Sequence, residues 1–345
     1  MRISTDPHLA LQRKSHTTKA SRAALADAIH GNALHSVTAG KPKAKVCVGD
    51  LFDTYSNSEA DILKAAKVAK HYDVVLAGNH DSLNVADSVS SLDLLAEMLP
   101  DTSFLINPDF ASHHVEYGEL EGMALAFVPH HGSQELFDAA LASMDYKAGE
   151  SAFSAVFLHC NYENGHTQGM DTSLNLTKVQ AEKLLTICDY IFLGHEHQPR
   201  QLLDGRLIIC GCTHPTSFSD ISDKYYYDLT KDWLEATLIW SVGTSYQEID
   251  FNAEGVLPEL NATTTIVDIK GEITADKGVQ LAEAIKNYWQ HPGVLMIRNS
   301  VRIVSEDHQV IETVDFDKLP EVIAEQLKGG DLEETYEYYR GLVQC

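Results

Sequence analysis

The chain has 345 residues, 44% of them apolar, and its 26 basic and 50 acidic side chains give a formal net charge of -24. This length suits one large domain with a smaller second one, and the acidic balance argues against a protein that holds nucleic acid through a broad basic surface of its own. No apolar run approaches the length of a membrane span and the first residues leave no room for a signal peptide, so a cytoplasmic protein without membrane contact is expected.

Short apolar runs with β-branched and aromatic residues recur through the first 200 residues and are each closed by glycine or a polar residue. They cover residues 44–48, 73–77, 155–158 and 190–193. Such runs are strand signals, and the stretches 58–71 and 177–188 between them have the pattern of helices. The alternation predicts a layered α/β core.

Polar motifs stand where these strands should end. In chain order they are Asp6-Pro7-His8, Gly49-Asp50, Gly78-Asn79-His80-Asp81, a lone His159, and Gly194-His195-Glu196-His197. Side chains at the ends of parallel strands converge on one rim of an α/β core, and glycine lets the backbone turn sharply there.

The residue types in these motifs suit a pair of divalent ions. A two-metal phosphoesterase needs a carboxylate able to bridge the ions, with further oxygen and imidazole ligands on each side. The motifs offer that set without a thiolate, which favours Mn²⁺, Fe or Zn, with Mg²⁺ as a further alternative. Each motif alone is a weak signal, but their joint order after predicted strands predicts a metal site.

The motif order resembles the calcineurin-like metallophosphoesterase superfamily. Two stretches are similar to the Mre11/SbcD nucleases within it: the string 49–53, Gly-Asp-Leu-Phe-Asp, and the turn 211–216 that follows a hydrophobic strand after the last metal motif. Cys212 and an inserted His214 depart from that turn. The short chain and the run 161–165 look closer to phage-encoded members than to cellular ones.

The resemblance implies a four-layer α-β-β-α sandwich that holds two ions, expected to be Mn²⁺. By position, the first ion would be held by Asp6, His8, Asp50 and His197, and the second by Asp50, Asn79, His159 and His195. His80 would face the scissile phosphate as general acid or charge stabiliser instead of binding metal, and Asp81 is predicted to orient its ring.

Three further histidines are predicted to contact substrate. His130 and His131 follow the strand-like run 124–128 and could reach the same rim, and His214 lies near the last metal motif. The alternative for each is a packing role. A Walker A sequence and a dinucleotide glycine motif are both absent from the sequence, so ATP hydrolysis would belong to a partner.

The sequence predicts a nuclease domain at residues 1–255, followed by two further segments. The runs 224–228, 238–242 and 246–251 are predicted as strands that complete that domain, and 252–261 as a linker. Residues 256–310 have a strand-helix-strand pattern, with the helix at 275–289, that resembles a small α+β capping domain. An extra lobe without a role in substrate choice is the alternative. Residues 311–345 have apolar positions at helical spacing, which would either dock on a partner or pack on the chain itself.

The leading hypothesis is a Mn-dependent DNA nuclease subunit that works with a coiled-coil ATPase of the Rad50/SbcC type and forms homodimers, as the resemblance implies. The net charge leaves two interpretations: either the partner holds the DNA, or the substrate is small. The alternatives are therefore a stand-alone phosphodiesterase or phosphatase on nucleotides, and a non-catalytic protein that binds a partner.

Overall fold

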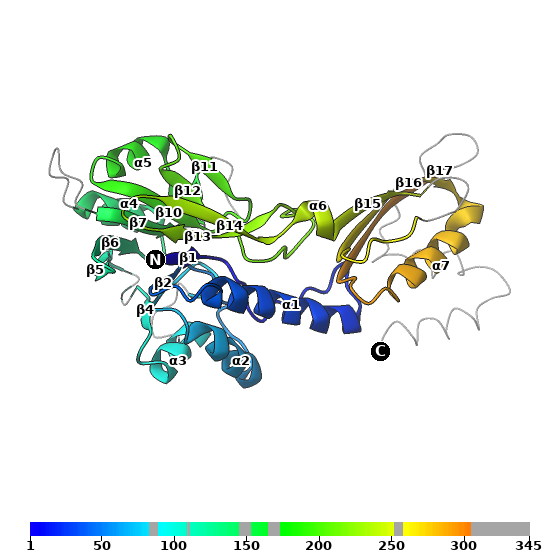
Figure 1. Ribbon diagram of the computed structural model, residues 1–345, viewed down its shortest axis with the longest axis horizontal. Coiled ribbons are helices and arrows are strands. Elements are labelled where there is room, and N and C mark those ends of the chain that lie inside the picture. Colours follow the sequence, from blue (N-terminus) through cyan, green and yellow to red (C-terminus); the bar gives the residue numbers. More distant parts are fainter. Residues whose placement is uncertain are drawn as a thin grey trace. The chain divides into compact units, whose positions relative to one another are not determined.

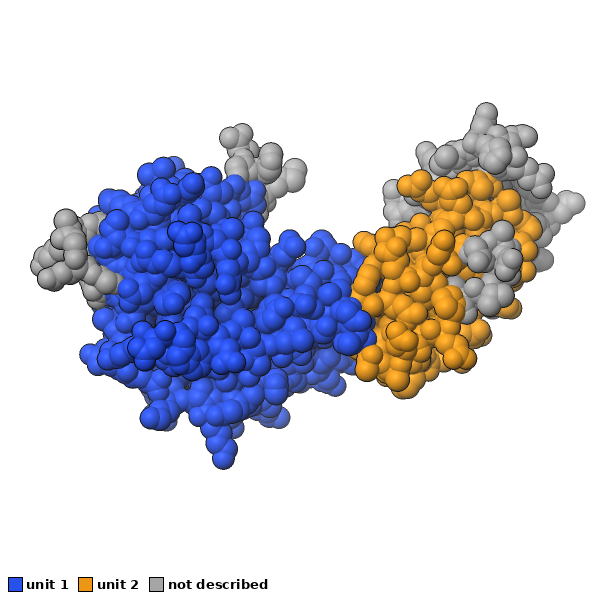
Figure 2. Space-filling model, turned by 45° about the horizontal axis from the view of Figure 1, so that its top comes forward, with its two compact units in different colours: residues 1–245 blue, residues 246–345 orange. Residues whose placement is uncertain are grey.

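The computed structural model describes residues 1–82, 89–107, 109, 111–144, 153–164, 173–251 and 258–304. The chain divides into two compact units, Met1–Ser245 and Tyr246–Cys345 (Figure 2). Each unit has a separate apolar core.

Unit 1 contains, within its described residues, two six-stranded mixed sheets (Figure 1). The first sheet has the spatial order β14 (Leu234–Trp240), β13 (Lys224–Leu229), β1 (Arg2–Ser4), β2 (Lys45–Cys47), β3 (Val74–Leu76) and β4 (Ser103–Leu105). The strands from β1 to β4 are parallel, whereas β13 pairs antiparallel with β1 and β14 pairs antiparallel with β13.

The second sheet follows the same plan with a parallel centre and antiparallel edges. Its spatial order is β11 (Arg200–Leu202), β12 (Leu207–Ile209), β10 (Cys188–Gly194), β7 (Phe153–His159), β6 (Met123–Val128) and β5 (Glu116–Leu120). The strands β12, β10, β7 and β6 are parallel. A short pair, β8 (Asn161–Tyr162) and β9 (Asn175–Leu176), lies outside the two large sheets.

The two sheets pack face to face with helices outside them, which confirms the predicted four-layer α-β-β-α sandwich. Helices α1 (Lys19–Thr38), α2 (Glu59–Ala69) and α3 (Ser91–Met98) lie on the first sheet, and α4 (Gln134–Ser143) and α5 (Lys178–Leu184) on the second (Figure 1). A one-turn helix, α6 (Val242–Ser245), ends unit 1.

Side chains along each strand point alternately to the two faces of the sheet, and this alternation places apolar residues against both neighbouring layers. In β6, Leu125 and Phe127 face the other sheet, whereas Ala126 and Val128 face the helices α4 and α5. All four are buried because both faces of the sheet are covered. Local capping sets the helix starts: the Ser58 side chain accepts from Asp61 N before α2, and Thr177 forms a capping box with Gln180 before α5.

The described residues of unit 2 form a parallel three-stranded sheet and one α-helix. Its elements are β15 (Tyr246–Asp250), β16 (Ile266–Thr274), a 3₁₀ turn at Ala275–Lys277, α7 (Gly278–Tyr288) and β17 (Met296–Val304). The core between sheet and helix is formed by residues such as Ile269, Leu281 and Ile297. The strand-helix-strand pattern predicted for this region is confirmed.

The predicted boundary between the domains, after residue 255, lies ten residues too late. The run 246–251 was expected to complete the first domain, but β15 pairs in parallel with β16, with Tyr246 opposite Ile266. The stretch 252–261 therefore connects two strands of one sheet. The predicted helical segment 311–345 lies outside the described residues.

Candidate metal centre

The predicted site residues lie just beyond the carboxyl ends of parallel strands in both sheets of unit 1. Asp6 follows β1, Asp50 follows β2, Asn79 follows β3, His159 ends β7 and His195 follows β10. Hydrogen bonds between the loops bring these ends together. Asp6 N donates to Gly49 O at 3.0 Å, and His195 N lies 3.1 Å from both carboxylate oxygens of Asp6, so the two sheets are joined at the site.

Several residues at this rim have left-handed backbone conformations, which residues other than glycine rarely adopt. Asp6, His8 and Asp50 have φ angles between 45° and 49°, and His195 has a φ of 90°. Such left-handed residues cost free energy, and they persist only where the surrounding structure holds them. Their concentration in the predicted motifs is therefore typical of a functional site.

Cluster one consists of Asp6, His8 and His197. Their ligand atoms lie within 4.8 Å of one another. The Nε2 atoms of His8 and His197 are 2.9 Å apart, and they lie 3.8 and 3.9 Å from Asp6 Oδ1. Ligands that share an ion with bonds of about 2.0–2.2 Å lie roughly 3 to 4 Å apart, so three donors at these separations fit around one ion.

The two imidazoles of cluster one are joined by a hydrogen bond between their Nε2 atoms. His197 Nδ1 donates to Asp220 at 3.0 Å, so its Nε2 is left to accept from His8. Burial opposes a charge on His8, but the nearby carboxylates of Asp53, Asp50 and Asp6 outweigh it and raise the pKa of this imidazole to about 9. A bound cation would replace this proton.

Cluster two consists of Asp50, Asn79, His159 and His195. Asn79 Oδ1 lies 3.1 Å from His159 Nε2 and 2.9 Å from His195 Nδ1. Asp50 Oδ2 lies 3.3 Å from His159 Nε2. His159 Nδ1 donates to Val48 O at 2.8 Å, which turns its Nε2 toward these oxygens.

Asp50 stands between the two clusters, as a bridging ligand must. Its Oδ2, 3.3 Å from His159, is also 3.9 Å from His8 Nε2 in cluster one. Burial would raise the pKa of the Asp50 carboxyl, but the charges of His159, His8 and His80 hold it well below its usual range. The residue is therefore a buried carboxylate ringed by imidazoles, a donor set that fits divalent ions.

His80 lies beside both clusters and is held by two hydrogen bonds. Its N donates to Asp50 Oδ1 at 2.9 Å and its Nδ1 donates to Asp53 O at 2.6 Å. Its ring centroid is 5.2 Å from that of His8. His8, Asp53 and His80 also offer ligand atoms within 4.8 Å of one another. Because Nδ1 is already engaged, Nε2 is the atom of His80 that can act on a substrate.

The prediction that Asp81 orients His80 is wrong. The Asp81 carboxylate is buried and accepts from Leu51 N, Phe52 N and Gly78 N, at 3.1, 2.9 and 3.0 Å. The residue thus holds the loop after β2 against the loop after β3, and the carbonyl of Asp53 orients His80 instead. Burial and the charge of Asp50 raise the pKa of Asp81 to about 6.

The three histidines predicted to contact substrate differ in their surroundings. His130 is buried beside the site, and its Nδ1 has no hydrogen-bond partner among the described residues. Burial and the neighbouring His159 lower its pKa to about 3. His131 is wholly buried, donates to Pro129 O and accepts from His114 N. His214 donates to Pro215 O. Substrate contact by these rings stays a prediction, and His131 joins its own loop to the segment before β5.

Asp220 is a site residue that the sequence did not reveal. Its Oδ2 accepts from His197 Nδ1 at 3.0 Å, and the opposing charges of His197 and Lys224 overcome burial to hold its pKa below the usual range. It lies 23 residues after His197 in a polar stretch without a recognisable motif. Only the fold brings the two together.

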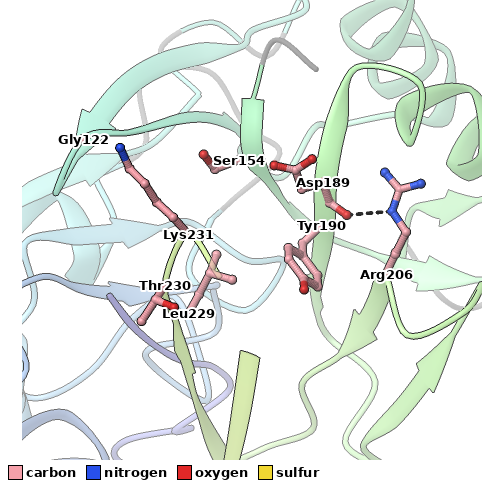
Figure 3. Close-up of a pocket in the computed structure, with 8 residues that line it drawn as sticks. All are labelled: Gly122, Ser154, Asp189, Tyr190, Arg206, Leu229, Thr230 and Lys231. Atoms are coloured by element: carbon pink, nitrogen blue, oxygen red, sulfur yellow. Dashed lines mark hydrogen bonds between the residues drawn. The ribbon is translucent and has the colours of Figure 1, made fainter. Parts of the chain in front are cut away.

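A separate cavity of about 560 Å³ lies at the other ends of the same strands (Figure 3). It is lined by Gly122, Ser154, Asp189, Tyr190, Arg206, Leu229, Thr230 and Lys231. Ser154 and Asp189 stand near the starts of β7 and β10, whereas His159 and His195 stand at their ends. The Arg206 side chain donates from Nε to Asp189 O at 2.9 Å (Figure 3). This cavity is therefore not part of the candidate centre.

Among the described residues, no helix is both long and apolar enough to cross a membrane. The sequence matches the model of one protein family, described as calcineurin-like phosphoesterase, over residues 3–199, which is more than half of the chain. The matched part runs from β1 through His197 and so includes both clusters, His80 and Asp81. Members of this family are metal-dependent phosphoesterases, and this chain belongs to the calcineurin-like phosphoesterase family.

Proposed function

We propose that this phosphoesterase is a DNA nuclease subunit of an Mre11–Rad50 or SbcCD-like complex. The observation that carries the phosphodiester chemistry is the pair of donor clusters with Asp50 between them and His80 beside them. The resemblance of the string 49–53 and the turn 211–216 to Mre11/SbcD nucleases supports DNA as the substrate, and a phage-encoded source and a cytoplasmic location belong to the same proposal.

In this proposal, two sets of residues that share Asp50 hold the metal ions. Divalent ions, for which we propose Mn²⁺, would be held by Asp6, His8, Asp50 and His197 on one side and by Asp50, Asn79, His159 and His195 on the other. When bound, such a pair activates water and stabilises charge on the phosphoryl oxygens.

His80 supplies the proton in this scheme. The Asp53 carbonyl fixes its Nδ1 as the donor and so leaves Nε2 to face the ester. A protonated Nε2 can then donate to the leaving oxygen, a role that depends on the position of the ring and not on metal ligation.

The charge of the chain supports the involvement of a partner. A net charge of -24 disfavours non-specific DNA binding, which rests on phosphate contacts by basic side chains. A coiled-coil ATPase of the Rad50/SbcC type would supply DNA binding and ATP hydrolysis, while this chain cuts. Homodimers and a role of unit 2 in selecting DNA are part of this proposal.

The alternative function is a stand-alone phosphodiesterase or phosphatase on nucleotides. The same net charge favours it, because a small phosphate ester needs only the local field of the metal ions and no extended basic surface. A non-catalytic protein that binds a partner is the third candidate. It is disfavoured because buried carboxylates such as Asp6 and Asp50 cost stability unless they are compensated.

The test compares DNA with a small ester. Single- and double-stranded labelled DNA and bis-p-nitrophenyl phosphate are incubated with Mn²⁺ and wild type, His80→Ala or Asp50→Ala. We expect wild type to cut both substrates and both variants to lose that activity.

Each outcome decides between the candidates. Cutting of DNA that both substitutions abolish supports the nuclease. Turnover of the small ester with intact DNA, also after addition of a coiled-coil ATPase of the proposed type from the same genome, supports the nucleotide-scale alternative. No turnover of either substrate by a protein that binds Mn²⁺ would support the non-catalytic candidate.

A further inference from the structure

The ring of His197 is held by a buried carboxylate. Asp220 Oδ2 accepts from His197 Nδ1 at 3.0 Å, and this carboxylate is almost wholly buried, whereas the His197 side chain is about a quarter exposed. A carboxylate behind an imidazole fixes its tautomer and strengthens the opposite nitrogen as a ligand. In His197 that opposite nitrogen is Nε2, the atom that His197 contributes to cluster one as a possible metal ligand.

Asp220 is itself fixed by several donors. Its Oδ2 also accepts from Thr216 N at 2.9 Å and from Thr216 Oγ1 at 2.8 Å, and its Oδ1 accepts from Ser217 N at 2.9 Å. The Cys212 thiol lies 3.8 Å from Oδ2. A carboxylate that accepts this many bonds has one orientation, so the ring in front of it has one orientation too.

Lys224 joins the backbones of the two residues. It is fully buried, and its ammonium group donates to His197 O at 2.9 Å, to Asp220 O at 2.6 Å and to Ser222 Oγ at 3.0 Å. A buried ammonium group needs such partners, because burial of an unpaired charge is costly. Lys224 begins β13 in the first sheet, so the contact between His197 and Asp220 is anchored to the sandwich.

The equivalent ring in cluster two has a different support. His159 Nδ1 donates to the neutral carbonyl of Val48 at 2.8 Å, and among the described residues no carboxylate accepts from that nitrogen. The rings of His197 and His159 are thus supported by chemically different groups, a carboxylate and a neutral carbonyl.

We infer that Asp220 is a positioning residue that fixes His197 as an Nε2 ligand and thereby sets the affinity of the ion in cluster one. This inference rests on the metal centre proposed above, but not on the identity of the phosphate ester. It predicts that loss of the Asp220 carboxylate weakens one of two ions and spares the other.

The test measures metal binding by the full-length protein. Mn²⁺ is titrated into wild type, Asp220→Asn and Asp220→Glu by calorimetry, and electron paramagnetic resonance distinguishes coupled pairs from single ions. Asp223→Asn is the matched control, because Asp223 also accepts a backbone N–H, from Val242 at 2.8 Å, but does not hold a ligand ring. His197→Gln defines the effect of losing the ring itself.

We expect Asp220→Asn to weaken one Mn²⁺ by about 10- to 100-fold and to convert the coupled signal to that of a single ion. Asp223→Asn should bind two ions as wild type does. The Glu variant keeps the charge and should recover part of the affinity. In the metal-free protein, ¹⁵N shifts of His197 should report Nδ1–H for wild type and a mixture of tautomers for Asp220→Asn.

The outcomes separate this inference from the proposed function. A wild-type protein that binds no pair of ions would contradict the metal centre itself. A folded Asp220→Asn protein that binds two ions with wild-type affinity would overturn the role of Asp220. If Asp220→Asn does not fold, Thr216→Val removes one donor from the carboxylate and should weaken the same ion by a smaller factor; unchanged binding in that variant would also overturn the inference.

Discussion

His80 is the residue whose role follows most directly from its contacts. Its Nδ1 is engaged by Asp53 O and its backbone N by Asp50, and it is outside both donor clusters. His80→Ala should therefore lower kcat for bis-p-nitrophenyl phosphate by about 10²- to 10⁴-fold, the usual contribution of a general acid. Mn²⁺ stoichiometry, measured by calorimetry, should stay at the wild-type value.

The control for this prediction is His113→Ala, which removes an exposed histidine and should leave kcat unchanged. A His80→Ala protein that hydrolyses the ester at the wild-type rate would show that the ring does not donate the proton. A variant that loses an ion would instead place His80 among the ligands.

The sequence predicted the members of the two clusters but not how they are supported. Motif order after strands is enough to place Asp50 or His159, because parallel strand ends converge. The support of His80 comes from a backbone carbonyl, which every residue has and which leaves no signature. Asp81 is adjacent to His80 in sequence, which favours an orienting role, but its carboxylate accepts hydrogen bonds from backbone N–H groups instead. Asp220 is distant in sequence and needed the fold.

The turn after β10 allows the two sheets to approach closely only because residue 194 is glycine. A Cβ atom added to Gly194 would lie 2.3 Å from Val48 O and 2.5 Å from Thr5 Oγ1. Both atoms lie at strand ends of the first sheet, whereas Gly194 ends β10 in the second. Gly194→Ala should thus push the two sheets apart where the clusters meet. We expect a destabilisation of about 1–3 kcal/mol, typical of overpacking, together with loss of tight Mn²⁺ binding. Urea unfolding and metal titration measure the two effects.

Gly31→Ala is the matched control for that substitution. Gly31 lies in α1, and a Cβ there would meet nothing within 4 Å. Because alanine favours a helix over glycine, this variant should gain up to about 1 kcal/mol and bind Mn²⁺ normally. Equal stability and equal metal binding in both variants would contradict the close approach at Gly194.

Elements with strong local signals were predictable, and their sheet membership was not. Helical sequence patterns predicted α2 and α7 closely, and β-branched runs predicted β7 and β10. The run at β15 has the same local pattern as a strand of the first domain, so nothing in it indicates which sheet it joins. The pairing of β15 with β16 is a long-range property.

In unit 2, an ion pair that contains a buried carboxylate should make stability depend on pH. Asp268 in β16 accepts from Arg298 Nε at 2.9 Å and from Tyr246 Oη at 3.2 Å. Burial opposes its charge, but the bonds and charge of Arg298 outweigh it and lower the pKa of Asp268. A lowered pKa in the folded state gives stability that is present above the unfolded pKa of about 4 and is lost as pH falls through the folded value.

Asp268→Asn should accordingly lower the melting temperature most near pH 7 and progressively less toward pH 3. Differential scanning calorimetry across that range measures the difference. Asp276→Asn, which changes an exposed carboxylate of the same unit, should have little effect at any pH. A melting-temperature difference for Asp268→Asn that stays constant from pH 7 to pH 3 would contradict this assignment.

At the scale of the whole molecule, the candidate centre belongs to one unit. Both clusters, His80 and Asp220 lie between residues 6 and 220, and the sheets that position them close within Met1–Ser245. Unit 2 has its own sheet and its own apolar core. Metal binding and ester hydrolysis should therefore be properties of unit 1 alone.

A chain that ends at Ser245 tests this division. Because no strand of unit 1 pairs with a strand of unit 2 among the described residues, the shortened chain should fold and bind two Mn²⁺ ions. Its kcat/KM for bis-p-nitrophenyl phosphate should stay within about threefold of the full chain, since the small ester contacts only the centre. If unit 2 helps to select DNA, as proposed, cleavage of double-stranded DNA should fall by tenfold or more, roughly the loss of 1.4 kcal/mol of interaction. Equal loss on both substrates would mean that unit 2 supports the fold of the centre, and no loss on either would remove unit 2 from substrate choice.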